Sequence, residues 1–138
     1  METIIVAYDD TEPASLALRQ AAELARALAA RLIVTTVSSL EEAGVPNEPA
    51  GELGAMPEDD VQALARARAF LEKEEVEATY QPAIGDPADA IVEIAERNDA
   101  DLIVVGTRDP GAIQRMFGYS VSQGVLRRAH CSVLVVRR

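Results

Sequence analysis

The fold is decided by residues 2–13, which have the sequence ETIIVAYDDTEP. Residues 2–8 are almost entirely apolar and rich in β-branched side chains, which is typical of a short strand buried on both faces. The DDTEP segment that follows has the chemistry of a turn and a helix start. Asp10 or Thr11 is expected to cap this helix, with Pro13 in its first turn.

The same alternation of strand and helix continues along the chain. Further strands are predicted at 32–37, 76–82, 101–106 and 131–136, and the one at 76–82 alternates in polarity like a strand at a sheet edge. Helices are predicted at 14–30, at 58–75, after the Gly85-Asp86-Pro87 turn and at 120–129, with an acidic loop at 38–57. This order predicts one α/β domain over residues 1–138, with a doubly wound, five-stranded parallel sheet and helices on both faces.

Length and composition exclude several classes of protein. A chain of 138 residues with 49% hydrophobic and 26% charged residues fits a single globular domain. Its net charge of −10, from 23 acidic and 13 basic residues, argues against nucleic-acid binding, which needs clustered cations. No apolar run approaches the ~20 residues of a membrane span, and Met1 leads directly into a strand-like segment. We therefore expect a cytoplasmic protein with no nucleic-acid or membrane partner.

A ligand site in an open parallel sheet is expected beyond the carboxyl ends of the strands, where the strand order reverses. The candidates at strand exits are Asp9, Val37, Gly85 and Gly106. The segment from Gly106 to Ser122 is the richest, because it joins a buried strand to a helix N-terminus that presents unpaired N–H groups to an anion.

This segment, together with VAYDDTE at 6–12 and CSVLVV at 131–136, resembles the universal stress protein family along the whole chain. The resemblance implies a Rossmann-like sheet whose strands, numbered along the chain, lie in the order 3-2-1-4-5. The switch point then falls between the first and fourth strands, so that Asp9 and Gly106 face each other across one crevice. The resemblance also implies a homodimer formed through the last strand, from Cys131 to Val136.

Nucleotide-binding members of that family carry a glycine, two residues, a second glycine, nine residues, and a third glycine followed by serine or threonine. Gly106 and Ser120 match the first and last of these positions. Asp109 and Tyr119 replace the second and third glycines, which adds a negative charge and a large ring where a phosphate would approach. The motif is therefore half kept.

By resemblance, the ligand is ATP or another adenine nucleotide. Adenine is assigned to Asp9 and the backbone of Val37. The phosphate path is assigned to Gly106, Arg108 and Ser120. Ser122, two residues further along the chain, is also assigned to the nucleotide site. Asp9 with Asp10 could contact Mg²⁺ bound to the nucleotide, and Gly106→Val is expected to abolish binding in a folded protein.

Each of these residues also has a purely structural interpretation. Asp9 could cap the first helix, Ser120 could cap the last one, and Gly106 could simply end a strand. Asp109 and Tyr119 support a second hypothesis, in which a protein of the same fold binds no nucleotide and works through dimerisation and an unknown protein partner.

The last strand also leaves two possibilities open. If it lies at the sheet edge, its exposed backbone invites pairing with a second copy. Alternatively, Arg137 and Arg138 protect the edge of a monomer.

No catalytic or metal site is predicted. His130, the one histidine, would lie about 15 Å along a helix from Ser120, too far for proton transfer. One histidine and one cysteine, Cys131, cannot build a zinc cluster, and a single cysteine excludes an intramolecular disulfide. We expect slow hydrolysis of a bound nucleotide at most.

Overall fold

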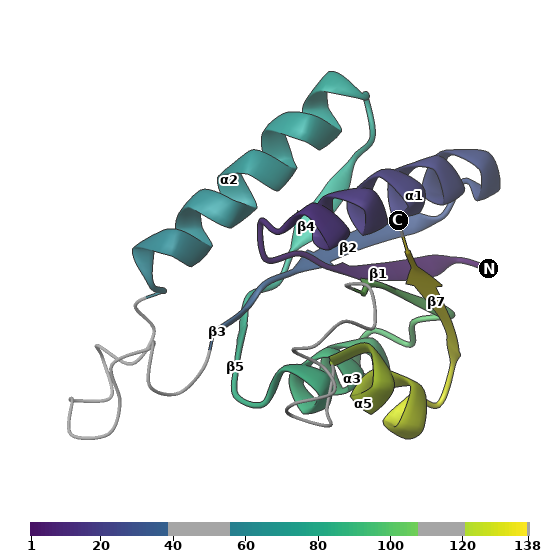
Figure 1. Ribbon diagram of the computed structural model, residues 1–138. Coiled ribbons are helices and arrows are strands. Elements are labelled where there is room, and N and C mark those ends of the chain that lie inside the picture. Colours follow the sequence, from purple (N-terminus) through teal and green to yellow (C-terminus); the bar gives the residue numbers. More distant parts are fainter. Residues whose placement is uncertain (39–55, 108–120, 138) are drawn as a thin grey trace.

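A five-stranded parallel sheet forms the centre of the computed structural model, which describes residues 1–38, 56–107 and 121–137 (Figure 1). The strands lie in the order β4-β2-β1-β6-β7, and each pair of neighbours is parallel. Their bounds are β1 Thr3–Ala7, β2 Arg31–Thr35, β4 Ala78–Tyr80, β6 Leu102–Gly106 and β7 Ser132–Val136. The predicted fold class and strand order are confirmed, and the switch point lies between β1 and β6.

The described helices cover both faces of this sheet (Figure 1). Helices α1 (Glu12–Leu28) and α2 (Glu58–Lys73) lie on one face, and α3 (Pro87–Arg97) and α5 (Val121–Arg128) lie on the other. Alternate residues of each strand supply the two cores, because successive side chains of a strand point to opposite faces. Ile4 and Val6 pack toward α1 and α2, whereas Ile5 and Ile103 pack toward α3 and α5.

The helices begin where capping chemistry predicts. Thr11 is the N-cap of α1, since its hydroxyl oxygen accepts a hydrogen bond from the Ala14 amide at 3.3 Å. Of the two residues that the sequence offers as the N-cap, Asp10 and Thr11, the structure has Thr11 in that position. Asp86 caps α3 in the same way and Pro87 follows at the first helical position. The apolar pattern predicts the end of α1 at residue 30, two residues too late. Ala29 adopts a left-handed conformation (φ 53°) and terminates the helix at Leu28.

A second, two-stranded sheet departs from the prediction. β3 (Val37–Ser38) pairs in parallel with β5 (Ala83–Ile84), so the expected strands at 32–37 and 76–82 are both wrong at their ends. The pairing of β2 with β4 resumes in β3 and β5 after a short break, as Gln81 and Ala83 donate to the carbonyls of Val34 and Thr36. This small sheet extends past the end of β1 and forms a wall beside the switch point.

In the parts of the chain that the structure describes, no helix combines the length and the apolar character needed to cross a membrane. Two segments lie outside the described ranges: residues 39–55, which make up most of the loop predicted at 38–57, and residues 108–120. This second group includes Arg108, Asp109, Tyr119 and Ser120.

Candidate ligand-binding site

A cavity of about 390 Å³ lies at the carboxyl ends of β1, β2 and β6, at the predicted switch point. Asp9, Val37, Gly106 and Ser122 line it, so the structure brings four of the six predicted site residues together. Asp9 and Gly106 belong to adjacent strand exits, as expected. Arg108 and Ser120 fall outside the described residues. Among the described lining residues Asp9 carries the only charged side chain, and most of the others are apolar.

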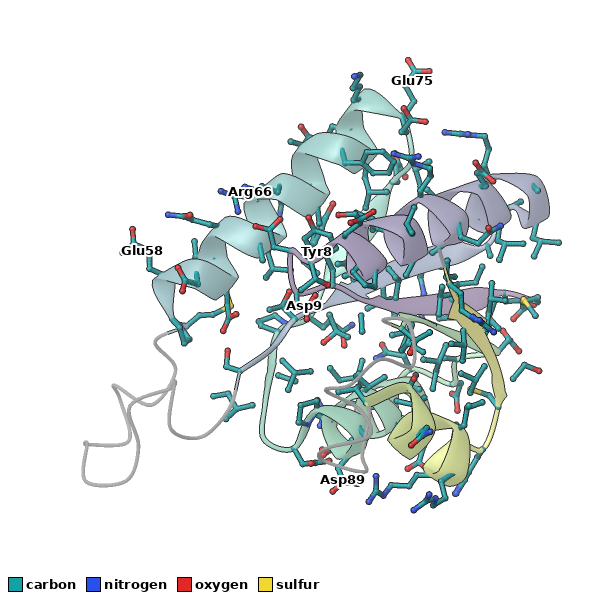
Figure 2. All side chains as sticks on the ribbon, in the orientation of Figure 1. Tyr8, Asp9, Glu58, Arg66, Glu75 and Asp89 are labelled. Carbon is teal, nitrogen blue, oxygen red and sulfur yellow. The ribbon has the colours of Figure 1, made fainter. Side chains whose placement is uncertain are left out.

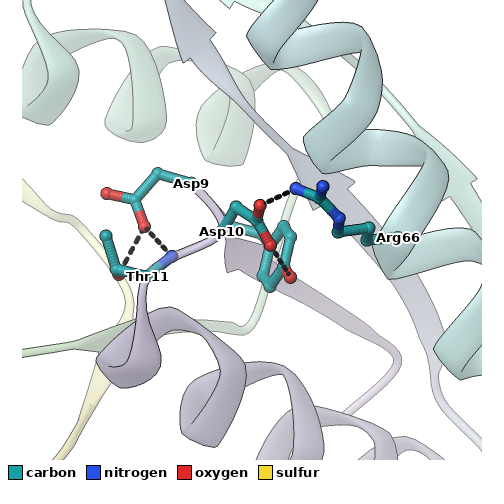
Figure 3. A network of polar contacts seen from close by, with 5 residues as sticks. Asp9, Asp10, Thr11 and Arg66 are labelled. Atoms are coloured by element: carbon teal, nitrogen blue, oxygen red, sulfur yellow. Dashed lines mark hydrogen bonds and ion pairs between the residues drawn. The ribbon is translucent and has the colours of Figure 1, made fainter.

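Asp9 organises the start of α1 without being its cap. Its Oδ1 accepts hydrogen bonds from the amide of Thr11 at 3.2 Å and from the Thr11 hydroxyl at 2.6 Å (Figure 3). The Thr11 hydroxyl in turn accepts from the helix, so it both donates and accepts. These contacts fix the Asp9 carboxylate at the rim of the cavity and make it an oriented hydrogen-bond acceptor.

The neighbouring Asp10 points away from the cavity, toward Arg66 of helix α2 (Figure 3). Figure 2 shows Arg66 on this helix, beside the loop that carries Asp9. Its carboxylate accepts a hydrogen bond from the Tyr8 hydroxyl at 2.8 Å and forms an ion pair with Arg66. Burial, and then the bond to Asp10, raise the pKa of Tyr8, so this phenol stays protonated and donates at neutral pH. The carboxylate of Asp10 is thus engaged by protein groups, which argues against the expected contact between Asp10 and Mg²⁺.

The backbone of Val37 is oriented toward the cavity side. Along this stretch the carbonyls of Val34, Thr36 and Ser38 accept from Gln81, Ala83 and Gly85, on the side of β4 and β5. The carbonyl of Thr35 accepts instead from Tyr8, on the side of β1. Peptide groups alternate in direction along a strand, so the carbonyl of Val37 faces the β1 side, where β1 has already ended. A ligand at the switch point would meet an exposed edge of backbone here.

Gly106 has a packing role that the sequence did not reveal. A Cβ at this position would lie 2.2 Å from the carbonyl oxygen of Pro13 and 2.5 Å from its carbonyl carbon. The first turn of α1 therefore approaches β6 so closely that only glycine fits. This contact argues against the expectation that Gly106→Val would leave the protein folded.

Ser122 lies at the opposite wall, in the first turn of α5. Its side chain is buried, and its hydroxyl is 3.4 Å from that of Thr107, which follows β6. Val121 and Ser122 both line the cavity, so α5 begins against it. A helix N-terminus favours an anion, because its first N–H groups have no partner within the helix.

Thr35 is a lining residue that the sequence does not distinguish from its neighbour. Thr35 and Thr36 are both ordinary strand formers and both are buried. The hydroxyl of Thr36 donates to the carbonyl of Tyr8 at 2.7 Å, whereas the hydroxyl of Thr35 has no hydrogen-bond partner. Period-two alternation directs the two side chains to opposite faces of the sheet, which only the fold could assign.

The remaining reactive side chains lie away from this cavity. His130 is exposed and its Nδ1 is 3.3 Å from the carboxylate of Glu96. Cys131 is half-buried, and burial raises the pKa of its thiol, which disfavours the nucleophilic thiolate. Within residues 1–38, 56–107 and 121–137, no three His, Cys, Asp or Glu side chains gather as metal ligands would.

The doubly wound parallel sheet, with its cavity at the switch point, defines an α/β protein with a Rossmann-like fold. A model of the universal stress protein family matches residues 1–137. The chain belongs to the universal stress protein family.

Two relatives illustrate how far the similarity extends. The chain is 31% identical over 138 residues to a universal stress protein of Methanocaldococcus jannaschii, covering 98% of this chain and 81% of that one. It is 35% identical over 145 residues to a universal stress protein of Thermus aquaticus, covering 99% and 98%.

Two solved structures of the family share the fold at somewhat lower identity. A universal stress protein in complex with cAMP superposes with a TM-score of 0.77 at 27% identity, covering 98% of this chain and 96% of that one. The Archaeoglobus fulgidus protein in complex with dAMP gives a TM-score of 0.71 at 26% identity, covering 98% and 97%.

Proposed function

We propose that this protein binds an adenine nucleotide in the cavity at its switch point. The observation that carries the proposal is that one largely apolar cavity is lined both by an oriented carboxylate, Asp9, and by the backbone of Val37, which faces the cavity. The ring nitrogens and exocyclic amine of adenine complement backbone N–H and C=O groups, and its flat faces suit apolar walls. The cAMP and dAMP complexes of the two similar proteins support the same ligand class.

The phosphate end of the ligand is assigned to the start of α5. Ser122 and the N-terminal turn of this helix border the cavity and provide a favourable environment for an anion. Arg108 and Ser120, which the family resemblance places along the phosphates, belong to the same proposal on sequence grounds alone. Two of the three glycines of the family motif are replaced in this chain, by Asp109 and Tyr119. A ligand with a single phosphate, such as AMP, needs the fewest phosphate contacts from this motif, so AMP is the probe of choice.

The proposal is tested by thermal unfolding and calorimetric titration with AMP, using GMP as the control ligand. A ligand at 100 times its Kd adds about 2.7 kcal/mol to the free energy of unfolding. For a domain of this size, that corresponds to a rise of about 10 °C in Tm. We expect this rise with AMP and a much smaller one with GMP. No rise with either nucleotide would contradict the proposal and favour the hypothesis of a partner-binding protein without a nucleotide.

Asp9→Asn tests the site itself. Asparagine keeps an acceptor for Thr11 but removes the charge, and we expect at least a tenfold weaker affinity for AMP. Asp101→Asn is the matched control, since the Asp101 carboxylate also accepts two hydrogen bonds, from the amides of Glu2 and Thr3, but at the opposite end of the sheet. Equal losses of AMP affinity in the two variants would show that the loss in Asp9→Asn does not arise from a ligand contact in the cavity.

The proposed role is regulatory and non-catalytic, carried out by a homodimer. β7 pairs only with β6 among the described strands and ends the sheet, and Val133 to Val136 are half-buried there. An apolar edge strand of this kind suits pairing with a second copy. Light scattering at micromolar concentration should give twice the 14.8 kDa of one chain. A mass of one chain under these conditions would contradict the dimer.

A further inference from the structure

Thr35 places an unpartnered hydroxyl inside the protein. Its side chain is fully buried, and Oγ1 has no hydrogen-bond partner. It is the only such side-chain atom in the described parts of the chain. Buried polar groups are nearly always satisfied, because an unmade hydrogen bond in the interior destabilises the folded state. An exception of this kind requires an explanation.

The position of Thr35 supplies one. Thr35 is the last residue of β2, in register with Ala7 of β1, and both line the cavity at the switch point. Alternation along β2 directs its side chain to the same face as Ile33, where Val105 and Ile91 also belong to the core beneath the cavity. Thr35 thus places a hydroxyl beside the apolar side chains of Ile91 and Val105, which line the same cavity.

We propose that the hydroxyl of Thr35 hydrogen-bonds the heteroaromatic base of the ligand, an inference that rests on the proposed function. A hydroxyl can donate to a ring nitrogen or accept from an exocyclic amine, so it suits the polar edge of adenine. Rotation about the Cα–Cβ bond moves the oxygen between staggered positions, which lets it turn toward a ligand that enters. Thr36 needs no such partner, because its hydroxyl already donates to Tyr8.

Thr35→Val tests this assignment because valine keeps the shape and removes the hydroxyl. Calorimetric titration with AMP is expected to show about tenfold weaker binding. In the absence of nucleotide, the Tm of the variant should equal or exceed that of the wild type, since no protein contact is lost. Thr35→Ser restores the hydroxyl and should bind AMP within threefold of the wild type.

Thr36→Val is the matched control for stability. It removes the hydroxyl that donates to the Tyr8 carbonyl and should lower the Tm of the ligand-free protein. A merely structural hydroxyl at position 35 would behave in the same way. A lower ligand-free Tm in Thr36→Val but not in Thr35→Val therefore separates a ligand contact from a packing role.

Three outcomes would overturn the assignment, and they differ in what else they contradict. If the wild type binds AMP and Thr35→Val binds it equally well, the Thr35 contact is wrong and the proposed function stands. If Thr35→Val lowers the ligand-free Tm as much as Thr36→Val, the hydroxyl has a protein partner. If the wild type itself fails to bind AMP, this result contradicts both the proposed function and the Thr35 contact.

Discussion

The carboxylate of Asp10 pairs with the guanidinium of Arg66 and so joins the loop after β1 to helix α2 (Figure 3). The same carboxylate accepts the Tyr8 hydroxyl, and the backbone of Asp10 has a left-handed conformation with φ of 65°. Aspartate tolerates this conformation better than most residues, because its short side chain can bond locally. As a result, the two neighbouring carboxylates point in different directions. Asp10 points toward Arg66, whereas Asp9 lines the cavity.

Substitutions of Asp10 should therefore depend on backbone conformation as well as on lost contacts. Asp10→Ala loses both polar partners and places a Cβ in left-handed backbone, and we expect it to cost about 2 kcal/mol of unfolding free energy. Asp10→Gly loses the same partners but relieves the backbone, so it should be about 1 kcal/mol more stable than Asp10→Ala. Urea unfolding measures both, and equal stability of the two variants would contradict the conformational argument.

The ion pair itself should contribute little. Arg66 and Asp10 are 58% and 31% exposed, and exposed pairs contribute about 0–1 kcal/mol. Arg66→Gln should therefore lower the free energy of unfolding by less than about 1 kcal/mol, and the loss should shrink in 1 M salt. A larger loss that persists at high salt would show that Arg66 stabilises the protein by packing.

The close approach of Gly106 to Pro13 makes position 106 intolerant of any side chain. Even Gly106→Ala places a Cβ against a backbone carbonyl that cannot move aside without shifting α1. Overpacking of this kind costs about 1–3 kcal/mol, which urea unfolding would detect without any ligand present. Unchanged stability would show that α1 can shift freely, and only then would Gly106 variants report on binding alone.

Helix α2 packs on the sheet through small side chains and one large one. Ala63 and Ala67 are buried together with Leu71, which is fully inaccessible. Leu71→Ala should cost about 2–5 kcal/mol, because it leaves a cavity in the core. Val61, on the same helix, is 47% exposed, and Val61→Ala should change the free energy of unfolding by less than about 0.5 kcal/mol.

Asp101 should make the stability depend on pH. Hydrogen bonds from the amides of Glu2 and Thr3 lower its pKa below the ordinary value of 3.8. A carboxyl whose pKa is lower in the folded state stabilises the protein above its unfolded pKa, and this contribution disappears as the pH falls through the folded pKa. The difference in unfolding free energy between wild type and Asp101→Asn should be present at neutral pH and vanish in that acid range. A difference that is constant down to pH 2 would contradict this assignment.

The sequence predicts the framework well because its signals are local. Apolar strand segments, the proline at the start of α1 and the Asp86-Pro87 pair all act within a few residues. The structure has β1, β6, β7 and both prolines where the sequence predicts them, whereas β2 ends earlier than predicted. The order of the strands followed from the family resemblance. The end of α1 could not be predicted, since Ala29 is not a residue that ordinarily ends a helix in left-handed conformation.

The candidate site contains some residues that the local sequence predicts and one, Thr35, that it does not. Asp9, Val37, Gly106 and Ser122 are found around one cavity because strand exits and helix starts converge there. The difference between Thr35 and Thr36 depends instead on which face each side chain takes and on what stands opposite it. Of two adjacent, identical residues, only Thr36 has a hydrogen-bond partner for its hydroxyl, and the tertiary fold determines this difference.

The contact between Gly106 and Pro13 bears on how family motifs are interpreted. A glycine at the end of β6 is required by the path of α1, with or without a nucleotide. An alignment in which this glycine never varies would thus record a constraint of chain packing, and a search pattern that counts it as a sign of nucleotide binding would score proteins that bind none. A position whose polar group has no partner within the described protein, such as the hydroxyl of Thr35, would carry more information about the ligand.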